Sequence, residues 1–148
     1  MIEIPEDVSS FLKRQNFLMV LTVNNEKVIN AAAKSVVQIE PTGKIYLVDL
    51  YEGKTRSNLE ENPNTTLCAI DEEEFQGWQL KGKAKAVDFK EGCKHLEYFD
   101  QHINKRIVER IIGNIKKNKL GEYSETHFPD PKYLIEFETE KIVNLAGK

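Results

Sequence analysis

The sequence predicts one mainly β domain over residues 1–148, a small antiparallel barrel with helices at its periphery. A length of 148 residues fits one domain and is too short for two of ordinary size. The 40% hydrophobic and 30% charged residues are typical of a folded globular protein. Short apolar segments follow one another through turn signals, which is the pattern of a hairpin-linked antiparallel sheet.

The first third of the chain predicts a short helix and then four strands. Pro5 suits the first turn of a helix, and Val8 and Leu12 follow it at helical spacing. Turn signals at Asn24 and Gly43 separate the apolar runs after this helix. The four strands are expected at residues 17–23, 27–33, 36–39 and 45–50.

The middle of the chain predicts a short helix over 54–62, stopped by Pro63, and two more strands at 65–70 and 78–87. The last of these strands has the clearest alternation in the sequence. Its inward residues become smaller along the chain, which indicates a narrow barrel or a closely approaching neighbour. The inward residues are Trp78, Leu80, Gly82, Ala84 and Ala86, and the outward ones are Gln79, Lys81, Lys83 and Lys85.

The last third predicts a helical insertion at 90–119 and two closing strands at 133–137 and 141–145. Isoleucine and valine recur on one stripe of the insertion, as on a helix that buries one face. Its function cannot be read from this pattern, because such helices can either cover a site or only pack against the barrel.

The charge balance points to a small-molecule partner. A formal net charge of −3 gives no broad attraction to nucleic acid or to an anionic membrane. No apolar stretch reaches the roughly 18 residues of a membrane span, and the N-terminus lacks the pattern of an export signal. We therefore expect a cytoplasmic protein in which Cys68 and Cys93 are reduced thiols that serve packing.

Residues 53–57, which read Gly-Lys-Thr-Arg-Ser, predict an anion site. They follow a strand and open a helix, so they combine unpaired helix N–H groups with the positive end of the helix dipole. Lys54 and Arg56 add charge, and Thr55 or Ser57 can donate a hydroxyl hydrogen bond. A phosphate group is the anion that this combination suits best.

Two other interpretations compete with this one. Thr55 could simply cap the helix while Lys54 and Arg56 stay solvated. Gly-Lys-Thr also ends the P-loop of nucleoside triphosphatases, but that motif needs a glycine where this chain has Val48. Nucleoside triphosphate binding is therefore not expected.

The segment from Ile45 to Val48, with Lys54, Leu59 and Asn62-Pro63, resembles the flavin-binding signature of the pyridoxamine 5'-phosphate oxidase-like split barrels. In that family a strand leads into a phosphate loop, a short helix ends in Asn-Pro, and another strand follows. The resemblance runs from about residue 8 to 87 and returns weakly at 133–145. It implies a split barrel that binds FMN.

The resemblance also implies a set of cofactor contacts. Lys54 and Thr55 would hold the FMN phosphate, and main-chain donors of the strand over 30–35 would reach the flavin ring. Because FMN lies between two subunits in this family, Trp78 and Gln79 would come from the partner chain, so a homodimer is implied. The expected cofactor-binding residues are Lys54, Thr55, Arg56, Ser57, Asn30, Ala31, Ala32, Ala33, Lys34, Val48, Asp49, Leu50, Trp78 and Gln79.

Several of these residues also have a structural interpretation. The alanines at 31–33 could be small only for barrel packing, and Trp78 could be a core or interface aromatic. The three histidines lack the i, i+4 pairing of metal ligands, and no metal is expected. The chain also lacks the arginines that the true pyridoxamine phosphate oxidases carry at 29–34 and near the C-terminus, so the vitamin substrate is not expected.

Two functions fit this sequence. The first is an FMN-dependent oxidoreductase that moves a hydride or electrons from a donor such as NAD(P)H to a small molecule. No catalytic residue is assigned, because the sequence offers no nucleophile constellation and the flavin would supply the chemistry. The second is a non-enzymatic carrier or sensor of FMN, a deazaflavin or haem.

Overall fold

The computed structural model describes residues 1–15, 17–49, 53–94, 96 and 132–147. Within these residues three helices accompany six strands. In chain order they are α1 (Glu6–Arg14), β1 (Leu18–Val23), β2 (Ile29–Ile39), β3 (Lys44–Asp49), α2 (Lys54–Glu61), β4 (Asn64–Asp71), β5 (Gln76–Asp88), α3 (Phe89–Cys93) and β6 (Tyr133–Asn144).

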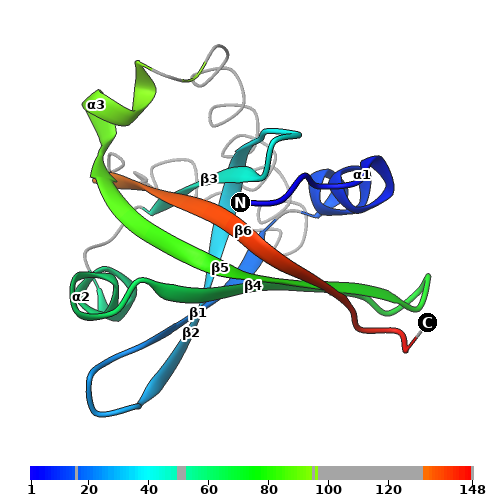
Figure 1. The fold of residues 1–148 in the computed structure, drawn as a ribbon, viewed down its shortest axis with the longest axis horizontal. Coiled ribbons are helices and arrows are strands. Elements are labelled where there is room, and N and C mark those ends of the chain that lie inside the picture. Colours follow the sequence, from blue (N-terminus) through cyan, green and yellow to red (C-terminus); the bar gives the residue numbers. More distant parts are fainter. Residues whose placement is uncertain (16, 50–52, 95, 97–131, 148) are drawn as a thin grey trace, which may run out of the picture.

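The six strands form a closed antiparallel barrel in the order β1-β2-β3-β6-β5-β4 (Figure 1). Strands that follow one another in the chain pair with each other, except β3 and β4, which α2 separates. The last strand, β6, lies between β3 and β5, and β1 pairs with β4 to close the barrel. The predicted class, a mainly β split barrel, is confirmed. Because the barrel is closed, each of the six described strands pairs with a neighbour on both sides, which reduces edge-to-edge aggregation.

The barrel interior is filled by the inward residues of all six strands. Leu47, Leu80 and Phe137 are fully buried there, as period-two alternation requires of the inward face. The predicted opening helix is confirmed as α1, whose Phe11 and Leu12 join the same core. Figure 1 shows α1 and α2 on opposite sides of the barrel.

A second apolar cluster lies on the outer face of β2, β3 and β6, where α3 and Leu96 cover the sheet. It contains Val37, Tyr46, Val48, Leu96 and Leu134. Phe89 and Cys93 of α3 pack against it. Of the helical insertion predicted over 90–119, residues 90–94 and 96 are described, and 90–93 belong to α3; residues 95 and 97–119 lie outside the described residues.

Two of the predicted strand divisions are wrong. Residues 27–33 and 36–39 do not form separate strands, because β2 runs unbroken through Lys34 and Ser35 with a register shift against β3 between Val36 and Gln38. Similarly, β6 joins the two strands predicted at 133–137 and 141–145, with a shift near Glu140. A bulge keeps the ladder continuous where the apolar pattern breaks.

The alternation predicted for 78–87 is confirmed in β5, where the outward lysines are exposed and Leu80, Gly82 and Ala84 are buried. A side chain at Gly82 would place its Cβ only 1.9 Å from the carbonyl oxygen of Glu138. The small residue is therefore required by the close approach of β6, as the shrinking inward face indicates.

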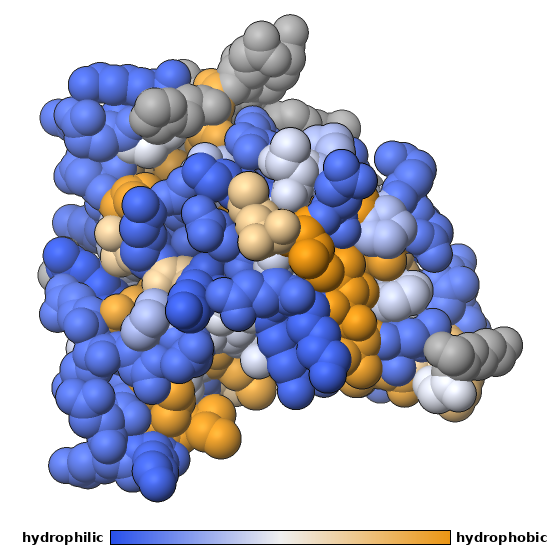
Figure 2. Space-filling view, in the orientation of Figure 1, coloured by the Kyte–Doolittle hydropathy of each residue, from blue (hydrophilic) through white to orange (hydrophobic). Residues whose placement is uncertain are grey.

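The face formed by β5 and β6 is mostly hydrophilic, and hydrophobic surface is confined to a band and smaller patches in Figure 2. The lysines of β5 and the glutamates of β6 contribute to this surface. Among the described helices, none has the length and apolar character needed to cross a membrane.

Candidate functional site

The predicted phosphate loop, residues 53–57, forms the N-cap and the first four residues of α2. The sequence predicted that this turn follows a fourth strand. Because β2 is one strand and not two, the turn follows the third strand, β3. Gly53 is the N-cap residue of α2, and no side chain caps the helix. The interpretation of Thr55 as the helix cap is therefore wrong, and the first-turn N–H groups of α2 have no side-chain acceptor from a cap.

The charges of α2 are arranged against its dipole. Lys54 and Arg56 occupy the first turn, which contains no acidic residue, while Glu60 and Glu61 occupy the last turn, which contains no basic one. A helix is normally stabilised by the opposite arrangement, because its N-terminus carries a partial positive charge. The first turn of α2 is thus a concentrated positive region, and the Lys54 side chain is exposed at its start.

Three contacts hold α2 firmly against the barrel. The Asn58 amide donates a 3.1 Å hydrogen bond to the hydroxyl of Thr22 on β1, and both residues are buried. Leu59 enters the main core, and Glu61 accepts a 2.9 Å hydrogen bond from the backbone of Asn25 in the β1–β2 turn. An anion at the N-terminus of α2 would therefore bind to a preorganised element.

Two of the predicted site residues meet in a buried ion pair. The Lys34 ammonium of β2 lies 2.8 Å from a carboxylate oxygen of Asp49, the last residue of β3. The same oxygen accepts a 2.6 Å hydrogen bond from the hydroxyl of Tyr133, the first residue of β6. Asp49 is 1% exposed, so its charge depends on these partners for stabilisation.

Tyr133 is a site residue that the sequence reasoning missed. Its ring also lies under Arg56 of α2, with 5.4 Å between the guanidinium carbon and the ring centroid. The Arg56 Nε lies 3.7 Å from a carboxylate oxygen of Glu60, one turn along the helix. Tyr133 therefore connects the Lys34–Asp49 pair to the phosphate loop.

The residues predicted to line a flavin ring divide between two faces of the sheet. On β2, Asn30, Ala32 and Lys34 are partly buried, whereas Ala31 and Ala33 are exposed on the outer face. Val48 belongs to the outer cluster and Asp49 points into the barrel. A ligand beside this part of β2 and β3 would therefore meet side chains of one face only, and Leu50 lies outside the described residues.

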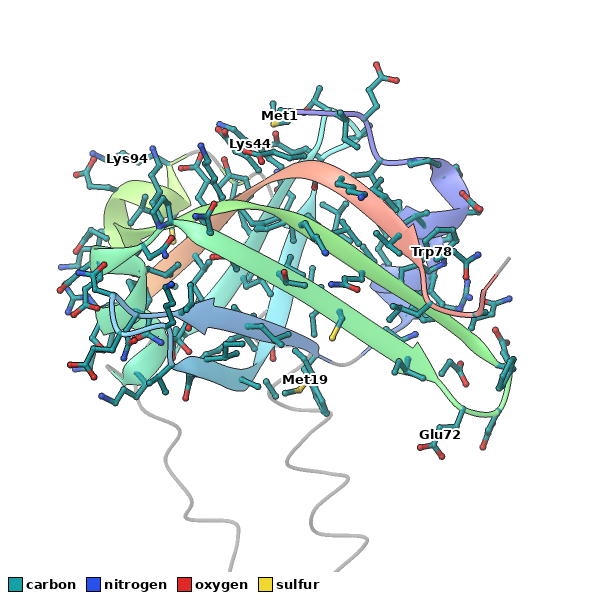
Figure 3. The ribbon with its side chains drawn as sticks, turned by 60° about the horizontal axis from the view of Figure 1, so that its bottom comes forward. Met1, Met19, Lys44, Glu72, Trp78 and Lys94 are labelled. Atoms are coloured by element: carbon teal, nitrogen blue, oxygen red, sulfur yellow. The ribbon has the colours of Figure 1, made fainter. Side chains whose placement is uncertain are left out.

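Trp78 and Gln79 are not near α2 in the same chain. Trp78 pairs with Ala69 towards the end of β4, while α2 leads into Asn64 at the start of that strand. Its ring is partly buried against the main core, and Figure 3 places it on the α1 side of the barrel. The structural interpretation of Trp78 holds within one chain, and a contact with a flavin would need a second chain.

Three groups with shifted pKa values, Lys44, Tyr46 and Glu136, lie on the outer face of β3 and β6. Burial by itself would raise the pKa of Glu136, but hydrogen bonds from Lys44 and Lys85 and their charges lower it below the ordinary value. The hydrogen bond to Glu136 raises the pKa of Lys44, and burial raises the pKa of Tyr46. Glu136 pairs with Lys44 and Lys85 in a surface ion-pair network on β3, β5 and β6.

No metal centre is formed by the described residues, in which no three His, Cys, Asp or Glu side chains are gathered around one point. His95, His102 and His127 all lie outside the described residues. Cys68 is a free thiol on β4, and burial raises its pKa. A raised pKa disfavours the thiolate, which is consistent with a packing role for Cys68.

The described site suits a phosphate group. A dianion at the first turn of α2 would receive backbone N–H donors and would meet the charges of Lys54 and Arg56. The Ser57 hydroxyl donates to the Lys54 carbonyl at 3.1 Å and is thus used within the helix. Thr55 is 2% exposed, so its hydroxyl could reach only a ligand that contacts the helix closely.

The comparison with protein families gives an extensive match. The family model described as pyridoxamine 5'-phosphate oxidase matches residues 4–143. The chain therefore belongs to the pyridoxamine 5'-phosphate oxidase family. Among curated proteins, none matches this chain.

Three solved structures illustrate the fold similarity. An F420 reductase has a TM-score of 0.64 at 16% identity, covering 95% of this chain and 98% of its own. An FMN-binding protein from Syntrophomonas wolfei has a TM-score of 0.60 at 21% identity, covering 92% and 82%. HutZ, a haem storage protein from Vibrio cholerae, has a TM-score of 0.58 at 17% identity, covering 96% and 94%. At these identities the likeness establishes the shared fold.

Proposed function

We propose that this protein binds FMN and uses it as the redox group of an oxidoreductase, with the FMN phosphate at the N-terminus of α2. The observation that carries the proposal is the reversed charge arrangement of α2, which lacks both an acidic residue and a side-chain cap in its first turn. Such an arrangement is unfavourable without an anion and favourable with one. Membership in the pyridoxamine 5'-phosphate oxidase family and the fold likeness to an FMN-binding protein support the choice of FMN.

In this proposal Lys54 and the first-turn N–H groups neutralise the phosphate, and Thr55 and Arg56 add donors. The flavin ring extends along β2 and the end of β3, where backbone groups and the small side chains of residues 31–33 allow close approach. FMN supplies the electron-transfer chemistry when bound, while the protein positions it and sets its electrostatic surroundings. We assign no ligand contact to Ser57, because its hydroxyl is used within the helix.

We further propose that the active form is a homodimer with FMN at the subunit interface. The outward residues of β1, β2 and β4 form an apolar surface, on which Ile29 and Ile70 are 69% and 65% exposed. Figure 3 shows Met19 pointing outward from β1 beside this surface. A cleft of about 310 Å³, lined by Ile70, Phe75 and Leu145, continues it at the β4–β5 turn. Sedimentation velocity would test the dimer, and a monomer at micromolar concentration would contradict it.

The electron donor that we propose is a reduced nicotinamide, NAD(P)H, which is available in the cytoplasm, and the acceptor is a small molecule. Purified protein should carry flavin absorbance that bleaches when NAD(P)H is added without oxygen. Yellow protein that ignores the donor would instead indicate a flavin carrier. A haem or deazaflavin spectrum would show that the cofactor is that group and not FMN. A colourless protein that does not bind added FMN would contradict the proposal.

The phosphate assignment predicts a specific loss of affinity. Lys54→Ala should weaken FMN binding by about 1.5 to 3 kcal/mol, the range for a hydrogen bond to a charged group. Titration of the flavin fluorescence measures this change. Lys83→Ala, on the exposed face of β5, is the matched control and should leave the affinity close to that of the parent. If Lys54→Ala binds FMN as tightly as the parent, the phosphate assignment is wrong.

A further inference from the structure

A continuous set of contacts leads from the barrel interior to the first turn of α2. The Lys34 ammonium and the Tyr133 hydroxyl meet the same oxygen of Asp49, at 2.8 Å and 2.6 Å. The ring of the same tyrosine contacts Arg56, whose guanidinium carbon lies 5.4 Å from the ring centroid. Four elements, β2, β3, β6 and α2, thus contribute one residue each to a single cluster.

The position of the Tyr133 ring is fixed by its surroundings. Tyr133 is 3% exposed and belongs to the main core, so packing restrains the ring. Its hydroxyl is held by Asp49, which is itself held by Lys34 and is 1% exposed. A buried hydroxyl without such a partner would be costly, so the cluster stabilises one orientation of the ring.

The fixed ring in turn restricts Arg56. A planar guanidinium over an aromatic face is held by cation–π attraction and stacking, which an ammonium group reproduces less well. Glu60, at 3.7 Å from Nε, restrains the same side chain along the helix. An arginine that is already ordered loses less conformational entropy when it binds an anion.

We propose that Tyr133 is a positioning residue that orders Arg56 for the phosphate of the flavin, with Asp49 and Lys34 holding Tyr133 in place. This inference rests on the proposed FMN site and adds to it the residue that organises one of its cations. Tyr133 acts through Arg56 and makes no contact with the cofactor itself. The affinity for a flavin that lacks the phosphate should therefore not depend on Tyr133.

The test measures FMN and riboflavin affinities by fluorescence titration for the parent, Tyr133→Leu, Arg56→Met and the double variant. Loss of the stacking platform should weaken FMN binding about two- to fivefold, while riboflavin, which lacks the phosphate, binds as before. In the Arg56→Met background the Tyr133 substitution should cause no further loss, because the residue through which it acts is gone. An equal loss for both ligands, or a loss that persists without Arg56, would overturn the inference.

Arg56→Lys tests the same inference without a change in the core. It keeps the charge and removes the planar group, so FMN affinity should fall while riboflavin affinity stays. If Arg56→Lys matches the parent, the stacked guanidinium is not needed and the inference fails. Tyr133→Phe retains the ring and should lose less affinity than Tyr133→Leu.

Two controls distinguish a failure of this inference from a failure of the proposed FMN site. Tyr46→Leu removes a comparably buried tyrosine, whose hydroxyl lies 3.4 Å from Glu136, and should leave the ratio of FMN to riboflavin affinity unchanged. If Lys54→Ala weakens FMN binding but the Tyr133 and Arg56 variants behave independently, the inference fails and the FMN site stands. If Lys54→Ala has no effect, the FMN site itself fails.

Discussion

The helices α1 and α2 lie on opposite sides of the same barrel and have opposite charge arrangements (Figure 1). In α1, Glu6 and Asp7 occupy the first turn and Lys13 and Arg14 the last, which complements the helix dipole. In α2 the cations come first and the acids last. The two helices are of similar length, so the charges of α1 favour its stability, whereas those of α2 disfavour it unless the anion that we propose is bound.

The interior contacts of the two helices differ in the same way. The inward side chains of α1 are apolar apart from Ser9, with Phe11 and Leu12 almost fully buried. The side of the barrel near α2 contains buried polar groups instead, among them Asn58 with Thr22 and Asp49 with Lys34. Polar groups in the interior need partners to offset their desolvation, so this side gains less from burial and more from specific geometry.

The largest expected effect lies on the α1 side. Phe11→Ala removes a 1% exposed ring from the main core and should lower the free energy of unfolding by about 3–5 kcal/mol. Chemical denaturation measures the loss. Phe17→Ala, at a 50% exposed position, is the control and should change stability far less. Equal losses at the two positions would show that α1 does not seal the core.

A smaller loss of stability is expected within the polar cluster. Asp49→Asn leaves the Lys34 ammonium, whose side chain is 14% exposed, without its countercharge and should cost about 3 kcal/mol. Adding Lys34→Met removes the uncompensated charge and should recover part of that stability. Chemical denaturation of Asp49→Asn, Lys34→Met and the double variant gives the coupling free energy between the two residues. If the losses of the two single variants simply add in the double variant, the two residues are not energetically coupled.

The smallest expected effect compares the helix dipoles directly. Lys54→Glu places an acid in the first turn of α2 and should raise the stability of the ligand-free protein by about 0.3–1 kcal/mol. Asp7→Lys in α1 makes the reverse change and should lower stability by a similar amount. Thermal unfolding without FMN measures both. Destabilisation by Lys54→Glu would contradict the view that α2 is charged against its own dipole.

The regular parts of the fold could be predicted from the sequence because their signals are local. The alternation in β5 and the helical spacing in α1 depend only on which face each residue presents. The divisions of β2 and β6 were mispredicted for the opposite reason. Lys34 interrupts the apolar pattern of β2, and its charge is compensated by Asp49, which belongs to another strand.

In the candidate site, too, residues with a local sequence signal could be predicted and residues that meet only through strand pairing could not. The anion-binding turn that we propose could be predicted because glycine, cations and hydroxyls lie together in residues 53–57. Tyr133 could not be found, because its contact with Asp49 spans 84 positions and exists only through the pairing of β3 with β6. No local signal in the sequence distinguishes Tyr133 from a tyrosine that serves packing alone.

The crystal structure of the complex with FMN tests the central claim most directly. The first-turn N–H groups of α2 and the Lys54 ammonium should lie within hydrogen-bond distance of the phosphate oxygens. A saturated complex whose phosphate binds elsewhere, while this turn contacts only water, would contradict the account.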